Sequence, residues 1–230
     1  MHRPTRRRAG LSRQPDAIDM AVATSHKLDA RSIQDLMSRV DAQFPPGRGR
    51  LTGFIAGAAG EGTTSVAWAY AHAVATQSRR RVLLLDAGSE EPGDPVGGRG
   101  SLVGALAMIA TERDPDAGNV AAVVMPKVPL PAAPGVVSVW ELLPRTELWY
   151  ALRERYDEVV IDLPAPSHSR VGLAIAPYCD GVAVVVEAEK ARAPVVENLI
   201  GHLRQVRARV LGAVLNKRRF HLPARIYRLL

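Results

Sequence analysis

Five short apolar segments of this sequence are unbroken runs, and helical patterns separate most of them. The segments are 51–56, 81–86, 158–162, 180–187 and 210–216. A strand with one face in water alternates apolar and polar residues, whereas a strand buried on both faces reads as a continuous apolar run. The pattern therefore predicts an α/β fold, a doubly wound and mostly parallel sheet with helices on both faces in a three-layer sandwich.

Length and composition are typical of one globular domain. The chain has 230 residues, of which 47% are hydrophobic and 23% charged, and these values exclude global disorder and fibrous repeats. Residues 1–24 are rich in Arg, Pro and Ala without apolar periodicity, so we expect a flexible basic arm there and a single domain over 25–230. One cysteine, Cys179, and no secretory or membrane-spanning pattern predict a cytoplasmic protein.

Basic residues gather at the two ends of the sequence. Residues 1–13 hold five arginines and residues 198–230 hold eight basic residues, Lys217 among them, with no acid in either stretch. The remaining 17 basic and 23 acidic residues give a mildly acidic body. Such ends suit an anionic surface, namely a membrane, a nucleic acid or an acidic partner, or they are a solvated tail and helix face. Both interpretations stay open.

Apolar periodicity and capping residues predict the elements between these strands. We expect helices at 25–44, 63–77, 101–110, 139–155 with an interruption near Pro144, and 194–207, and a further strand at 120–125.

A glycine-rich turn joins the first strand to the following helix. Gly57, four further residues, Gly62, Thr63 and Thr64 occupy the frame of the phosphate-binding P-loop, G-x-x-x-x-G-K-[ST]. Glycines let backbone N–H groups approach phosphate oxygens, and the helix N-terminus adds positive potential. We expect the amides from Gly57 through Gly60, Glu61 and Gly62 to Ser65 to converge on an anion, with Glu61 pointing either into the site or into solvent.

Thr63 departs from that pattern, because the P-loop lysine that reaches the terminal phosphates belongs at this position. A threonine offers a hydroxyl and no cation. A dinucleotide site remains a rival interpretation, since Gly57, Gly60 and Gly62 are dense and Asp86 lies 24 residues after Gly62. Against an NAD(P)-dependent reductase, no tyrosine is followed by a lysine four positions on.

Two acids end neighbouring apolar runs, Asp86 and Asp162. The carboxyl ends of parallel strands meet at one edge of a sheet, so we expect both acids to face the hollow beside the loop. Mg²⁺ prefers such oxygen ligands, and Thr64 stands where the P-loop hydroxyl binds it. Thr64, Asp86 and Asp162 are therefore the candidate metal ligands, and the two acids the candidate catalytic residues; the alternative is that each acid caps a nearby loop or helix.

Residues 54–86 resemble the nucleotide-binding core of the bacterial tyrosine autokinases of capsule and exopolysaccharide synthesis. The family's loop, P-G-E-G-K-[ST]-[ST], its second motif, V-L-L-I-D-x-D-x-R-x-P, and its third, y-D-x-V-I-I-D-x-P, correspond to residues 59–65, 82–92 and 156–164. Residues 180–186 and 211–217 are also similar, so the resemblance spans about 50–230 in the family's order. It implies a P-loop domain related to partition and septum-site ATPases, with ATP and Mg²⁺ as cofactors and Asn216 near the base.

The departures from the family concern catalysis. Thr63 replaces the loop lysine, Gly88 and Glu90 replace an acid and an arginine of the second motif, and the last fifty residues hold only Tyr227 where the family has a tyrosine-rich tail. The resemblance therefore implies a nucleotide-binding component of polysaccharide synthesis with weak or no kinase activity, a pseudoenzyme that regulates a membrane copolymerase or chain-length protein. It also implies peripheral attachment at the inner membrane and a homo-oligomer.

Two other functions remain open. An active ATPase or autokinase could take its missing charge from a partner subunit's arginine. An NAD(P)-dependent oxidoreductase is the less favoured one. No specific nucleic-acid binding is expected, because no surface of aromatic residues interleaved with Arg and Lys is evident.

Overall fold

The computed structural model describes residues 20–22, 30–87, 123–124 and 143–217. The strands are β1 (Met20–Val22), β2 (Arg50–Ala56), β3 (Val82–Asp86), β4 (Val123–Val124), β5 (Glu158–Asp162), β6 (Gly181–Glu187) and β7 (Val210–Asn216). The helices are α1 (Ala30–Asp41), α2 (Thr63–Gln77), α5 (Thr146–Arg155), α6 (Val171–Ile175), a 3₁₀ turn (Ala176–Tyr178) and α7 (Ala193–Gln205).

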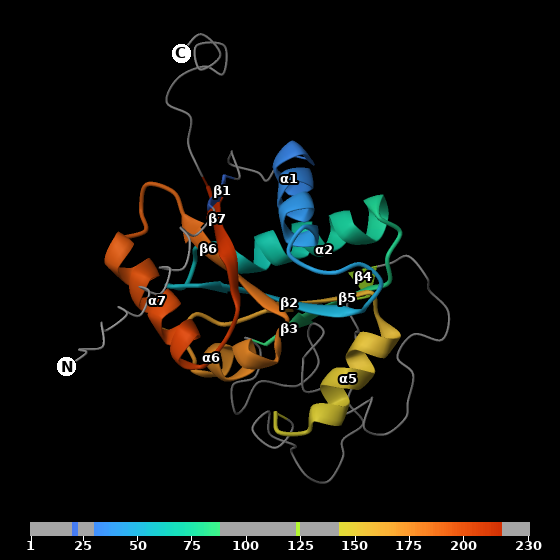
Figure 1. Ribbon diagram of the computed structural model, residues 1–230. Helices are drawn as coiled ribbons and strands as arrows, with labels where there is room; N and C mark the ends of the chain where they lie inside the picture. The colour runs from blue at the N-terminus through green and yellow to red at the C-terminus, as the bar shows by residue number, and fades with distance from the viewer. Residues whose placement is uncertain (1–19, 23–29, 88–122, 125–142, 218–230) are drawn as a thin grey trace, which may run out of the picture.

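The described strands form one sheet in the order β1-β7-β6-β2-β5-β3-β4, and every neighbouring pair is parallel (Figure 1). Helices α1 and α2 cover one face, and α5, α6 and α7 cover the other. The predicted doubly wound α/β sandwich is therefore confirmed. None of the helices in the described segments is both long and apolar enough to cross a bilayer.

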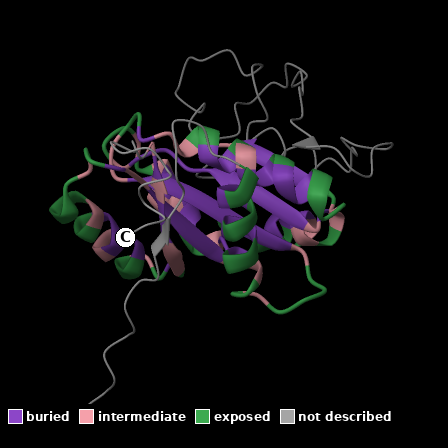
Figure 2. Ribbon diagram, turned by 90° about the horizontal axis from the view of Figure 1, so that it is seen from above, coloured by how far each residue is buried: buried purple, intermediate pink, exposed green. Residues whose placement is uncertain are grey.

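Strand β2 shows why the apolar runs are unbroken. All seven of its residues are buried (Figure 2). Its side chains divide between two separate cores. Leu51 and Ile55 pack with α5, α6 and α7, whereas Phe54 and Ala56 pack with α1 and α2. A central parallel strand has no face in water, so every position favours an apolar or fully paired residue.

Most predicted elements are confirmed with small shifts at their ends. Helix α2 has the predicted bounds, while α1 ends at Asp41, before the predicted Phe44, and α5 begins only at Thr146, after Pro144. The sequence analysis did not predict α6 and its 3₁₀ turn, because Pro164, Pro166 and Pro177 interrupt the apolar pattern. The helix expected at 101–110 lies outside the described residues.

Strand β1 corrects the expected boundary of the N-terminal arm. Met20, Ala21 and Val22 pair in parallel with Ala213, Val214 and Leu215 of β7, so these three residues belong to the sheet. Three apolar residues are too few to produce a recognisable pattern, and the pairing depends on a strand nearly two hundred residues later. Residues 1–19 lie outside the described residues, and an arm over them stays a prediction.

A buried ionic network holds the amino ends of the central strands. Glu158 has no exposed surface, and its carboxylate accepts hydrogen bonds from Arg50 Nε at 2.7 Å, Thr52 Oγ1 at 2.7 Å and Tyr70 Oη at 3.0 Å. Arg50 also pairs with Asp41 at the end of α1. Burial opposes ionisation of Arg50, but the Glu158 carboxylate raises the pKa of the guanidinium above its usual value. The network joins β2, β5, α1 and α2.

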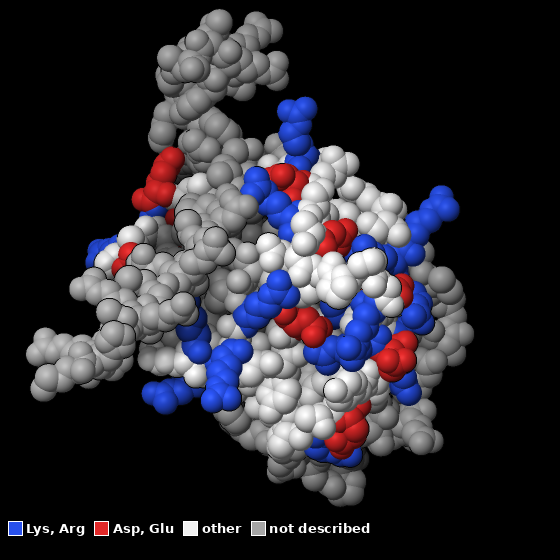
Figure 3. Space-filling view, viewed as in Figure 1, with Lys and Arg blue, Asp and Glu red and all other residues white. Residues whose placement is uncertain are grey.

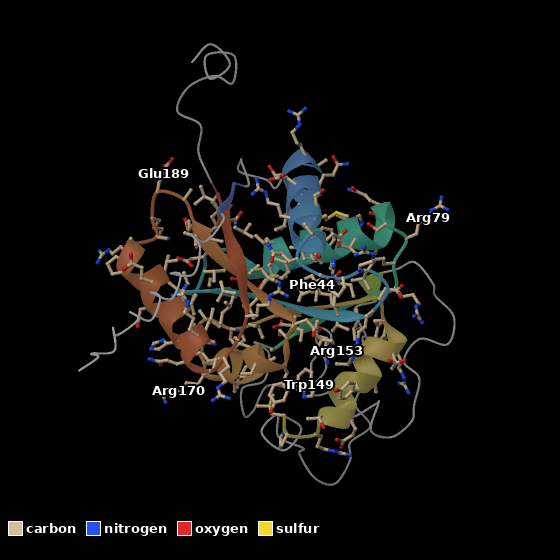
Figure 4. All side chains as sticks on the ribbon, viewed as in Figure 1. Phe44, Arg79, Trp149, Arg153, Arg170 and Glu189 are labelled. Carbon is tan, nitrogen blue, oxygen red and sulfur yellow. The ribbon has the colours of Figure 1, made fainter. Side chains whose placement is uncertain are left out.

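Arginine side chains reinforce both layers, through contacts with the Phe44 ring on one face and through hydrogen bonds of Arg153 on the other (Figure 4). The Phe44 ring lies 4.9 Å from the Arg50 guanidinium carbon and 5.2 Å from that of Arg209, which links the end of α1 to the starts of β2 and β7. On the other face, Arg153 of α5 donates to the carbonyl of Tyr178 at 2.9 Å and to Asp180 at 3.0 Å.

Charged side chains of both signs interleave over α1 and α5 on the face shown in Figure 3. Exposed ion pairs include Arg39 with Asp35 on α1, and Arg81 with Asp157, the residues directly before β3 and β5. The basic ends expected from the sequence lie largely outside the described residues.

Replacing Arg50 with methionine should lower the free energy of unfolding by about 3–5 kcal/mol, because it removes the nearer cation of the buried Glu158 carboxylate. The carboxylate then keeps only the partly exposed Arg80 among the described residues, with Nη1 3.6 Å away. Urea unfolding at pH 7 measures the loss. The matched control is Arg39→Met, which removes an exposed pair on α1 and should cost less than about 0.5 kcal/mol. Equal losses in the two variants would contradict a stabilising role for the buried network.

Candidate functional site

The glycine turn after β2 places the start of α2 at the carboxyl edge of the sheet. Gly60 and Gly62 have φ values of +84° and +91°, a left-handed backbone that glycine adopts without strain. Gly62 is the N-cap of α2, and no side chain among the described residues caps the helix. The first-turn amides of Thr63, Thr64 and Ser65 have no acceptor within the helix, so this end attracts an anion.

Gly62 also allows a close approach from β7. A Cβ atom at this position would lie 2.2 Å from Asn216 Nδ2, an impossible contact. Asn216 is buried and donates from Nδ2 to the carbonyl oxygen of Glu61 at 2.9 Å. Asn216 therefore fixes the loop from the side of β7, and its expected place near a nucleotide base stays a prediction.

Glu61 turns back on its own loop. Its carboxylate accepts a hydrogen bond from the amide of Gly57 at 3.1 Å and another from the amide of Ala58. Burial raises the pKa of Glu61 above its usual value, although these two hydrogen bonds oppose the shift. The expectation that every amide from 57 to 65 faces an anion is thus wrong for residues 57 and 58, because an internal carboxylate already occupies them.

The two strand-end acids lie where the sequence analysis placed them. Asp86 and Asp162 are directly paired in the register of β3 and β5. Each lies two residues after a position that packs on the α2 side, Leu84 on β3 and Val160 on β5. Because side chains alternate along a strand, both acids belong to the α2 side of the sheet. The Thr64 hydroxyl donates a hydrogen bond to Asp162, so the start of α2 and the end of β5 are in contact. Thr64, Asp86 and Asp162 therefore converge at one point.

Burial makes Asp162 a weaker acid than an ordinary aspartic acid. Only 7% of the residue is exposed, and burial together with the Asp86 charge raises the pKa of Asp162 to about 6, while the hydrogen bond from Thr64 partly opposes the shift. A carboxylate in this position favours a cation at its side. A hydroxyl and two carboxylates fit Mg²⁺, which takes few protein ligands and completes its shell with water and phosphate. No cluster of three or more metal-binding His, Cys, Asp or Glu side chains occurs among the described residues.

Sequence reasoning missed two residues of this edge, Glu187 and Lys217. Lys217 follows β7 directly and donates from Nζ to the carbonyl oxygen of Gly60 at 2.5 Å. The same ammonium pairs with Glu187 at the end of β6, 3.2 Å away. The sequence analysis counted Lys217 with the basic C-terminal stretch. Its place immediately after a strand-end asparagine was the signal that could have assigned it to the site.

Replacing Gly62 with alanine should destabilise the protein by about 2 kcal/mol or more, since it combines left-handed backbone strain with a clash against Asn216. Gly60→Ala has the same backbone strain in open space and should cost only about 1–2 kcal/mol. Gly201→Ala, within α7 and with open space around it, should be neutral or stabilising. Chemical denaturation ranks the three variants, and any other order contradicts the loop geometry.

The stability of the protein should depend on pH through Asp162. Because the pKa of Asp162 is raised to about 6 in the folded state, from an ordinary value of 3.8, the folded state binds the proton more tightly than the unfolded state does. The stability that the protonated Asp162 carboxyl contributes is fully present below about pH 4 and is lost as the pH rises through about 6. The free energy of unfolding of Asp162→Asn, measured relative to that of the original protein, should therefore rise by about 2–3 kcal/mol as the pH is raised from 4 to 8. Urea unfolding at both pH values measures the gain, and a pH-independent difference would contradict it.

Comparison with solved structures identifies proteins that share the fold of this chain. No protein-family model and no curated protein matches the sequence. Among solved structures, the chimerical protein CapA2B2 is 19% identical with a TM-score of 0.62, covering 83% of this chain and 85% of that chain. The kinase domain of Escherichia coli tyrosine kinase ETK is 19% identical with a TM-score of 0.61, covering 84% and 78%.

Two further structures extend the comparison. The VpsO kinase domain is 22% identical with a TM-score of 0.55, covering 80% of this chain and 90% of that chain. A ParA family ATPase from Chlorobium tepidum is 19% identical with a TM-score of 0.50, covering 77% of each chain. The chain thus has the fold of bacterial tyrosine kinase domains and ParA-type ATPases, the fold that the sequence resemblance implied.

Proposed function

We propose that this chain is a P-loop nucleotide-binding component of exopolysaccharide or capsule synthesis that binds ATP with Mg²⁺ and has weak or no kinase activity. The contact that carries the proposal is the hydrogen bond from Thr64, at the start of α2, to the buried carboxylate of Asp162, beside Asp86. It brings an anion-binding helix end and a cation-binding pair of acids to one point.

The chain's own residues divide the binding between them. The first-turn amides of α2, at Thr63, Thr64 and Ser65, would bind phosphate oxygens, while Gly60 and Gly62 shape the turn. Thr64, Asp86 and Asp162 would hold Mg²⁺, which screens phosphate charge when bound. Asn216, which is tied to the Glu61 carbonyl, would lie near the base, as the resemblance implies. Gly57 and Glu61 act as supports of the loop.

Weak phosphoryl transfer follows from Thr63. A hydroxyl there hydrogen-bonds but brings no positive charge to the terminal phosphate, and transfer depends mainly on such charge stabilisation. A protein that binds nucleotide without rapid turnover suits a regulatory partner. The sequence resemblance supports the cytoplasmic face of a membrane copolymerase or chain-length protein as that partner, and peripheral attachment at the inner membrane.

A second candidate is an active autokinase or ATPase completed by a partner subunit, since solved structures with this fold are named as tyrosine kinase domains. An arginine of a neighbouring subunit would supply the missing charge. Phosphotyrosine mapping after incubation with ATP, with and without the membrane partner, separates the two functions. Phosphorylation in either condition favours the active kinase.

Calorimetric titration with ATP–Mg²⁺ tests the proposed binding. The protein should bind the nucleotide at submillimolar concentration, and Asp162→Ala should weaken binding at least about tenfold by removing a metal ligand. Asp157→Ala removes an exposed acid at the opposite end of the same strand and should leave the affinity unchanged. No binding at millimolar nucleotide would reduce the protein to a scaffold.

A further inference from the structure

The Lys217 side chain contacts the glycine-rich loop before α2. A Cβ built on Gly62 would lie 3.5 Å from Lys217 Cε, and the ammonium reaches the carbonyl of Gly60. The side chain therefore passes over the loop at Gly60 and Gly62, and Gly62 directly precedes Thr63, the position that lacks a lysine. Gly62 and Lys217 are 155 residues apart in sequence, and only the order of β2, β6 and β7 brings them together.

The backbone of Lys217 adopts a left-handed conformation, as those of Arg79, Glu189 and Arg207 do. Its φ of +56° is left-handed, which is uncommon for lysine. Such a conformation persists only where neighbouring interactions hold it, and it is concentrated at functional sites. Here the buried Asn216 precedes it, and the Gly60 carbonyl and the Glu187 carboxylate hold its ammonium.

The ammonium of Lys217 keeps one donor for a ligand. An ammonium has three N–H donors. Two of them meet acceptors in the described part of the chain, Gly60 O at 2.5 Å and Glu187 Oε2 at 3.2 Å. The side chain is 42% exposed, so an anion in solution can reach it.

We propose that Lys217 supplies the positive charge that Thr63 does not bring to the loop, by donating a hydrogen bond to a phosphate oxygen of the bound nucleotide. The inference rests on the proposed nucleotide binding and assigns a residue to it. Glu187 holds the ammonium at the loop in the absence of ligand, and the lysine enters from β7 rather than from the loop itself.

Lys190 offers a matched control. It pairs with the same Glu187 carboxylate at 3.6 Å, but its side chain is 77% exposed and, among the residues that the structure describes, Glu187 is its ion-pair partner rather than any residue of the loop. Replacing Lys190 or Lys217 with methionine removes the same charge and one partner of Glu187. Only the replacement of Lys217 removes the contact with Gly60.

The experiment measures ADP–Mg²⁺ and inorganic pyrophosphate binding by calorimetry. Lys217→Met should weaken both probes about tenfold, the usual effect of one charge-assisted hydrogen bond, while Lys217→Arg and Lys190→Met stay within about twofold of the original protein. In a Thr63→Lys background, Lys217→Met should cost less than about threefold, because a lysine in the loop makes the second cation redundant.

Three results would overturn the inference. In the first, Lys217→Met binds ADP as well as the original protein does. In the second, it loses the same factor with and without Thr63→Lys, which identifies a lysine that only supports the loop. In the third, the original protein binds neither ADP–Mg²⁺ nor pyrophosphate. Of the three results, this one also contradicts the proposed function.

Discussion

The buried carboxylate of Glu158 is the constraint on which the arrangement of the molecule depends. Glu158 and Arg50 are register partners on β5 and β2, and their charges neutralise each other away from water. A slip of one residue between the strands would separate the two charges and leave both buried. Tyr70 extends the same constraint to α2. Once this register is set, Asp162 at the far end of β5 and Thr64 at the start of α2 have little freedom of position.

Much of the fold and part of the site could be predicted because they depend on local patterns. Unbroken apolar runs identified the buried strands, and the Gly-rich turn fixed the start of α2 at Thr63. The convergence of Asp86 and Asp162 followed from a general property of parallel sheets, in which all strands end at one edge. No knowledge of side-chain contacts was needed for these inferences.

The remaining features depend on contacts between distant segments. The direction of Glu61 is decided by competition between solvent and the amides of Gly57 and Ala58, and a sequence does not show which prevails. The position of Lys217 depends on a left-handed residue after β7 and on β6 lying between β7 and β2. Strand β1 is three residues long and gains its stability from its partner rather than from its own composition.

The pairing of β1 has a mechanical consequence. Its partners on β7 are residues 213–215, directly before Asn216 and Lys217, which hold the loop through Glu61 and Gly60. A displacement of β1 would therefore be passed through three backbone pairings to the strand whose end contacts the loop before α2. The only β1 contact needed for this link is its three-residue pairing with β7, so the first described strand and the loop before α2 are connected through a single strand.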